Sequence, residues 1–131
     1  MLTGSYHCGT LCWSFTGQPD SATACNWTIG RRYGALWIYG WAGETITTTG
    51  LSTAYSHGAV IEFHFCSTCG CLAHYQGRQR DEQGRQQMAV SLRMIDDPAT
   101  VAALPIDHFD GLDTFDTLPR DHRCVADMWF S

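Results

Sequence analysis

Residues 60–70 read Val-Ile-Glu-Phe-His-Phe-Cys-Ser-Thr-Cys-Gly, and this stretch is the most specific indication of the fold. In its first half the apolar Ile61, Phe63 and Phe65 share one side of an extended chain, which predicts a half-buried β-strand. Its second half is a Cys-x-x-Cys-Gly motif, in which two thiolates can bind one ion while the glycine permits a tight turn. The stretch therefore predicts a strand that ends at a metal-binding turn.

Strand-like patterns recur along most of the chain. Runs rich in aromatic, apolar and β-branched residues occur at 6–15, 35–39, 44–48, 71–75 and 88–94. Residues 78–87 are polar and indicate an exposed loop or hairpin end. One helix is expected over 97–104, because Asp97 can cap it, Pro98 suits its first turn and Pro105 stops it. The fold class is therefore mainly β, with one short helix near 97–104.

The composition is that of a folded globular protein. With 131 residues, 44% hydrophobic and 12% aromatic, the chain is expected to form a single domain over 1–131 around one core. Met128-Trp129-Phe130 is too apolar to remain in solvent and is expected to pack on the sheet. Cys12 and Cys124, which have apolar neighbours, are expected to be small core residues.

Charge and hydropathy disfavour two classes of partner. A formal net charge of −5, with no basic cluster beyond Arg31-Arg32 and the 78–85 turn, disfavours nucleic-acid binding. No run approaches the roughly 18 apolar residues of a membrane span, and the first residues lack the features of a secretory signal. A cytoplasmic location is therefore expected. In that compartment seven cysteines, an odd number, do not indicate a disulfide framework.

The cysteines indicate a metal site instead. Cys8, followed by Gly9, has the form of a second knuckle, so Cys8, Cys66 and Cys69 are expected to converge as three thiolates. The competing interpretation is that Cys66 and Cys69 form a reduced pair without metal. A redox pair is disfavoured, because a strand rather than a helix follows it. The fourth ligand stays open among His7, His64, Cys71 and a water.

Taken together, the motifs resemble one known family. They are Gly4-Ser-Tyr-His-Cys-Gly9, the segments 22–35 and 65–70, and, further on, 91–97, Phe109-Asp-Gly111 and Trp129-Phe130. In this order they resemble the glutathione-dependent formaldehyde-activating (GFA) family, which is related to centromere protein V. The resemblance implies a β-tent fold and zinc binding. It also implies a carbon–sulfur lyase reaction, the reversible addition of glutathione to formaldehyde that gives S-hydroxymethylglutathione.

The resemblance implies a structural zinc site in which one family cysteine is replaced. Three of its ligands correspond to Cys8, Cys66 and Cys69, and Tyr6 stands where the family has the fourth cysteine. The family's second zinc, at the catalytic site, is held by three cysteines. A site of that kind leaves one coordination position open for a substrate atom.

This chain departs from the family most at the catalytic site. Cys25 remains, while Trp27 and Gly30 stand where the family has cysteines. One thiolate cannot hold zinc against water, so the catalytic zinc is expected to be lost and Cys25 to be a remnant. Zero to one zinc per chain is expected, against two in the family pattern.

Two functions follow from the resemblance. By family, the chain is a carbon–sulfur lyase of the S-(hydroxymethyl)glutathione synthase type, with weak or absent activity because its catalytic site is incomplete. The alternative is a non-catalytic binding module, either zinc-stabilised or metal-free, of the same fold. The expected partner is a small thiol such as glutathione, whose carboxylate Arg31 and Arg32 can attract. Those two arginines are equally well explained as solvated surface charges.

Overall fold

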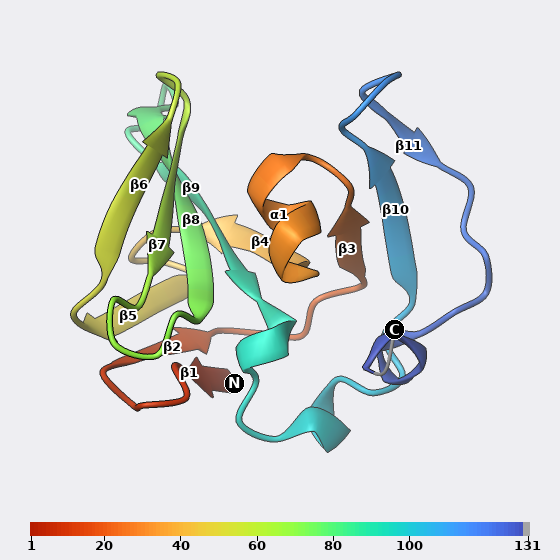
Figure 1. Ribbon diagram of the computed structural model, residues 1–131, viewed down its shortest axis with the longest axis horizontal. Coiled ribbons are helices and arrows are strands. Elements are labelled where there is room, and N and C mark those ends of the chain that lie inside the picture. The colour runs from red at the N-terminus through yellow and green to blue at the C-terminus, as the bar shows by residue number, and fades with distance from the viewer. Residues whose placement is uncertain (130–131) are drawn as a thin grey trace.

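The computed structural model describes residues 1–129, with the exception of the His57 side chain, and consists of two β-sheets (Figure 1). The smaller sheet is antiparallel and has the strand order β1-β2-β5. Its strands are β1 (Leu2–Ser5), β2 (Leu11–Phe15) and β5 (Ile46–Gly50). The loop between β1 and β2 carries the Tyr6-to-Gly9 motif, so the smaller sheet presents this motif at one end.

The larger sheet has the order β11-β10-β3-β4-β9-β8-β7-β6. All its pairs are antiparallel except β10 with β3, which is parallel. Its strands are β3 (Ala22–Cys25), β4 (Leu36–Trp41), β6 (Thr53–His57), β7 (Ile61–Phe65), β8 (Leu72–Arg80), β9 (Gln86–Ser91), β10 (Ile106–Asp110) and β11 (Asp116–Leu118). In Figure 1 the β6–β8 strands and the β10–β11 hairpin stand on opposite sides of α1 (Thr28–Tyr33), the one α-helix within residues 1–129.

A different cluster of hydrophobic side chains packs on each face of the larger sheet. Successive residues of a strand point to opposite faces, so neighbouring side chains belong to different clusters. On β4, Leu36 and Ile38 belong to the main core, which is shared with the smaller sheet, while Trp37 between them belongs to a second cluster. On β9, Val90 is in the main core and Ala89 in the second cluster. The second cluster also includes partly buried residues of β3 and α1, so it lies on the face that α1 covers.

The predicted mainly β fold is confirmed, but the helix lies elsewhere. Residues 97–104 contain only a 3-10 turn, η2 (Pro98–Thr100), in which the Asp97 carboxylate accepts the Ala99 N–H at 3.2 Å as predicted. The single α-helix, α1, was not predicted, because no side chain caps it. The helix ends at Tyr33, and Gly34 caps it in the left-handed conformation (φ of 63°), which glycine adopts at little steric cost.

Most predicted strands are present, and the turn at 81–85 confirms the hairpin end expected over 78–87. Cys12, expected in the core, is exposed, because Leu11, Trp13 and Phe15 take the inward positions of β2. Two further 3-10 helices are η1 (Leu92–Met94) and η3 (Val125–Met128). Met128 and Trp129 pack against the main core as expected, and Phe130 lies outside the described residues. No described helix is long and apolar enough to cross a membrane.

Candidate functional site

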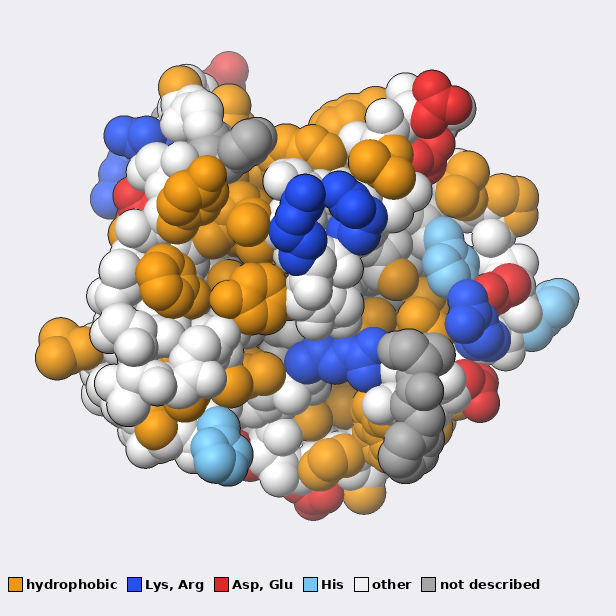
Figure 2. All heavy atoms as spheres, viewed as in Figure 1, with side chains coloured by type: hydrophobic (Ala, Val, Ile, Leu, Met, Phe, Trp, Pro, Cys, Tyr) orange, Lys and Arg blue, Asp and Glu red, His pale blue; other side chains and the backbone are white. Residues whose placement is uncertain are grey.

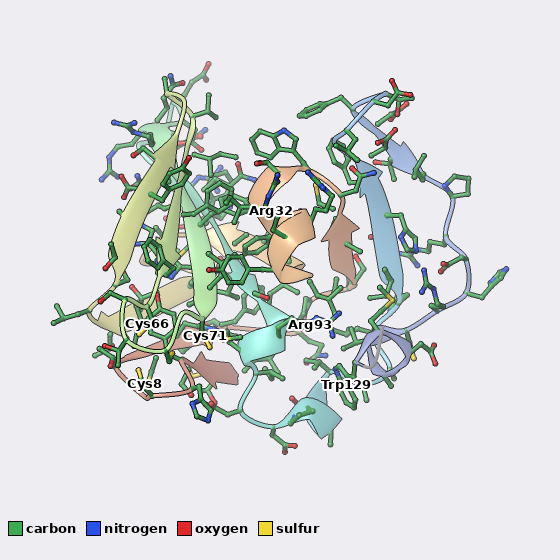
Figure 3. The ribbon with its side chains drawn as sticks, in the orientation of Figure 1. Cys8, Arg32, Cys66, Cys71, Arg93 and Trp129 are labelled. Carbon is green, nitrogen blue, oxygen red and sulfur yellow. The ribbon has the colours of Figure 1, made fainter. Side chains whose placement is uncertain are left out.

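Three cysteine thiols meet where the loop between β1 and β2 approaches the loop between β7 and β8. The Sγ atoms of Cys8, Cys66 and Cys69 all lie within 4.8 Å of one another, and those of Cys8 and Cys66 are 3.5 Å apart. A tetrahedral zinc with Zn–S bonds of about 2.3 Å requires sulfurs roughly 3.8 Å apart. Figure 3 shows Cys8 below Cys66 and Cys71 at the end of the larger sheet. These three thiols could therefore hold a metal ion.

The backbone around the cluster has the form of a metal knuckle. The N–H groups of Thr68 and Cys69 both point at the Cys66 sulfur at 3.4 Å, and the Gly70 N–H donates to the Cys66 carbonyl at 2.9 Å. Gly70 has a φ of 77°, which closes the turn at little steric cost. Hydrogen bonds from the backbone N–H groups of Cys71 and Cys8 lower the pKa of Cys69 to about 6. The turn thus favours the thiolate form that a metal requires.

Tyr6 lies close enough to the cluster to interact electrostatically with its three cysteines. Its side chain is buried, with 1% exposure, and its hydroxyl has no hydrogen-bond partner among the described residues. Burial, reinforced by the charges of Cys66 and Cys69, raises the pKa of the phenol far above its ordinary value. Tyr6 therefore stays neutral, and it contributes no charge to the three thiolates.

The other candidates for the fourth ligand lie outside the cluster. His7 is exposed, and its backbone N–H bonds to the Cys71 thiol. His64 is engaged elsewhere: Ser52 Oγ lies 2.8 Å from its Nδ1, and Glu62 lies 3.0 Å from its Nε2. Cys71 is next to Cys69, but it is not among the thiols that lie mutually within 4.8 Å. These contacts argue against His7 and His64, while Cys71, whose thiol hydrogen-bonds with the Cys69 thiol, and a water stay open as the fourth ligand.

Cys25, Trp27 and Gly30 lie far from this cluster, on the wall of a cavity of about 440 Å³. The cavity is open to solvent on one side and is lined by residues of β3, α1, β4, the β6–β7 turn, β7, β8 and the β10–β11 hairpin. Its other lining residues are Trp37, Tyr39, Gly58, Ala59, Val60, Ile61, Phe63, Tyr75, Phe109 and Phe115. The lining is thus almost entirely apolar and aromatic.

Strand register builds the aromatic side of this cavity. Ala89 on β9 pairs with Tyr39 on β4 and with Tyr75 on β8, and Tyr75 pairs in turn with Phe63 on β7. The small Ala89 leaves space between two tyrosines whose ring centroids are 6.5 Å apart, and Phe63 lies edge-on to Tyr75 at 5.9 Å. Burial raises the pKa of both tyrosines, so their hydroxyls stay neutral.

The surroundings of Cys25 do not form a zinc site. The Cys25 sulfur accepts the Trp27 N–H at 3.4 Å, much as Cys66 does with Thr68. However, no group of three ligand atoms among the described side chains includes Cys25. A Cβ placed on Gly111 would lie 2.3 Å from the Trp27 Cβ, so the tryptophan packs directly on that glycine. The turn geometry is retained, but the ligands that would complete a site are absent.

Asn26 ties this region to the β10–β11 turn. Its side-chain oxygen accepts the Gly111 N–H at 2.7 Å and the Leu112 N–H at 3.0 Å, and its amide donates to Asp110 at 3.0 Å. Asp110 in turn accepts the Thr114 N–H, and these bonds hold the pKa of its carboxyl well below its usual range. Phe115 follows this turn and lines the edge of the cavity. Its side chain is 67% exposed, and its backbone φ is 55°.

Asn26→Ala is expected to lower the free energy of unfolding by about 1–3 kcal/mol, because the Gly111 N–H loses its acceptor and the Leu112 N–H keeps only Asp110. Urea denaturation followed by tryptophan fluorescence measures the change. The exposed Gln83→Ala in the β8–β9 turn is the control and should leave stability unchanged. Equal midpoints for the two variants would show that Asn26 does not hold the turn.

A second cavity of about 290 Å³ adjoins the first and shares Cys25, Gly30 and Phe109 with it. Arg31 and Arg93 both line this second cavity. Arg32 does not line it, and its guanidinium donates to the Thr28 carbonyl at 3.2 Å. Figure 2 shows arginine side chains over α1 and over η1 on one face, with hydrophobic side chains beside them.

Several residues that shape these cavities could not be identified as site residues from the sequence. Tyr39 and Tyr75 lie in runs of strand character, and only the strand register shows that they line a cavity. Arg93 lines its cavity because Gly34 and Met128 position its guanidinium, and these contacts are long-range.

Comparison with known proteins identifies no family. No protein-family model matches the chain, and no curated protein matches it. Among solved structures, a crystal structure of a Rhodobacter sphaeroides protein, a structural genomics target, is similar with a TM-score of 0.59. The two are 20% identical, over 79% of this chain and 98% of that chain. At this identity the likeness shows the fold alone.

Proposed function

We propose that this chain is a β-tent domain of the GFA type that binds small molecules and is stabilised by one zinc ion. In this proposal Cys8, Cys66 and Cys69 hold the zinc, and the cavity at Cys25 is a ligand site without metal. The domain acts in the cytoplasm, where its thiols stay reduced. The observation that carries the proposal is Cys25, a lone thiol on the wall of an otherwise apolar cavity of about 440 Å³.

The donor set of the cysteine cluster supports zinc. Three thiolates within 4.8 Å of one another are compatible with a tetrahedral site, and two knuckle N–H groups already point at the Cys66 sulfur. Bound zinc would link the β1–β2 loop to the β7–β8 loop, which are far apart in sequence, and would thereby stabilise the fold. The neutral Tyr6 phenol leaves the fourth position to a weak donor, so affinity below that of a four-cysteine site is expected.

The residues at Cys25 do not fit a catalytic zinc, and this opposes the lyase function implied by the family resemblance. Trp27 and Gly30 offer no ligand atom in their side chains, and no described carboxylate or imidazole joins Cys25 in a group of three. The size and apolar lining of the cavity remain suited to a small ligand, since ligand sites of about 300–1,000 Å³ are typical. The support therefore favours the binding module over the enzyme.

The zinc-loaded chain is expected not to accelerate the reaction of glutathione with formaldehyde. NMR exchange spectroscopy on a mixture of the two measures the rate, which should equal that of buffer with and without the protein. A Cys25→Ser variant is the matched control and should give the same rate. An enhancement by the unaltered chain that disappears in Cys25→Ser would overturn the proposal and restore the lyase function.

A further inference from the structure

We infer that the two adjoining cavities together bind a small carboxylate with an apolar, aromatic body. The ring would lie in the larger cavity and the carboxylate would lie among the arginines of the smaller one. This inference rests on the proposed function and specifies its ligand class.

The larger cavity fits an aromatic body rather than a polar one. Aromatic side chains approach it from several strands, and Trp37 lies edge-on to Tyr75 with ring centroids 5.0 Å apart. The edges and faces of these aromatic side chains would stabilise a bound aromatic ring by more than the burial of its surface alone. The polar side-chain groups there are few: the Cys25 thiol, the two neutral tyrosine hydroxyls and the indole N–H groups of Trp27 and Trp37.

The smaller cavity differs in charge. Arg31, exposed on α1, and Arg93, partly buried on η1, both line it. The Arg93 guanidinium is held in place by the Gly34 carbonyl at 2.8 Å and the Met128 carbonyl at 2.6 Å. A guanidinium has five N–H donors, so these two bonds leave others for an anion. Because the cavities share Cys25, Gly30 and Phe109, one molecule can contact both.

What distinguishes Arg31 and Arg93 is their place at a cavity that adjoins the apolar one, in a chain with a net charge of −5. Arg78 and Arg80 also have no carboxylate partner among the described residues, but they donate to the Gly58 and Gly84 carbonyls at hairpin turns. Three arginines form ion pairs with aspartates, namely Arg85 with Asp81, Arg120 with Asp107 and Arg123 with Asp121. Among the described residues no carboxylate lies within ion-pair distance of Arg31, Arg32 or Arg93. In an acidic protein, cations left without a carboxylate at a cavity are complementary to an anionic ligand.

The test compares three probes by isothermal titration calorimetry: phenylbutyrate, its neutral analogue phenylbutanol, and butyrate, which has no ring. Phenylbutyrate is expected to bind at least about ten-fold more tightly than phenylbutanol, since a charge-assisted hydrogen bond contributes about 1.5–3 kcal/mol. Butyrate should show no measurable binding, because it lacks the apolar body.

Variants separate the two ends of the ligand. Arg31→Met should weaken phenylbutyrate about ten-fold and leave phenylbutanol unchanged. Arg80→Met, in the β8–β9 hairpin, is the control and should change neither. Equal affinities for the acid and the alcohol would overturn this inference while leaving the binding module intact. Failure of both aromatic probes to bind would instead overturn the proposed function together with the inference.

Discussion

Replacing Cys66 by serine is expected to abolish zinc binding and to produce the largest loss of stability of any single change considered. Cys66 is buried at the centre of the cluster, 3.5 Å from the Cys8 sulfur, and its own sulfur accepts two backbone N–H groups. With zinc a thousand-fold above its dissociation constant, binding contributes about 4 kcal/mol to the free energy of unfolding. Removal of one of three thiolates should eliminate that contribution.

Thermal unfolding with equimolar zinc and with a chelator measures the effect. The unaltered chain should lose stability when the chelator is added, and Cys66→Ser should be equally unstable in both conditions. Cys12→Ser is the matched control, because Cys12 is an exposed thiol that lies outside the cluster. If Cys66→Ser still responded to zinc as the unaltered chain does, the ion would be bound elsewhere.

Replacing Trp27 and Gly30 by cysteine together is expected to create a second zinc site. The Cys25 sulfur already accepts the Trp27 N–H at 3.4 Å, so the turn needs little rearrangement. Removal of the indole relieves its close packing on Gly111. At residue 30 the new Cβ would lie 3.1 Å from the Trp37 Nε1, so that ring must move by a few tenths of an ångström.

Zinc content by mass spectrometry under native conditions should therefore rise from one ion per chain to two in the double variant. The triple variant that also contains Cys25→Ser is the control, and it should return to one ion. The double variant should also lose binding of phenylbutyrate, because Trp27 no longer lines the cavity. A double variant that still binds a single zinc ion would show that residues 25–30 do not correspond to the family's catalytic segment.

The cluster of three cysteines could be predicted from the sequence, because each half of it is a local motif. Cys-x-x-Cys-Gly fixes the distance between its own sulfurs, and Cys8-Gly9 supplies the facing turn. Tyr6 at the fourth position was expected from the family resemblance, not from a local motif. The chain folds back on itself there, with the Tyr6 N–H bonded to the Leu11 carbonyl at 3.0 Å.

The sheet was predictable from alternation, but α1 and the cavity were not. The helix has no capping side chain, begins at Thr28 with a φ of 25°, and is stabilised by packing rather than by local propensity. The cavity needs Ala89 to lie between Tyr39 and Tyr75, which only the pairing of three strands can arrange. Cys12 could have been placed correctly, since Leu11 and Trp13 already show the period of two.

In the proposed function Cys8, Cys66 and Cys69 hold zinc and Cys25 does not. Zinc K-edge X-ray absorption on the purified chain, together with its metal content, tests this directly. We expect one zinc ion per chain with three sulfur ligands and one light-atom ligand, unchanged in Cys25→Ser. Two zinc ions per chain, or a spectrum that changes in Cys25→Ser, would contradict the proposed function.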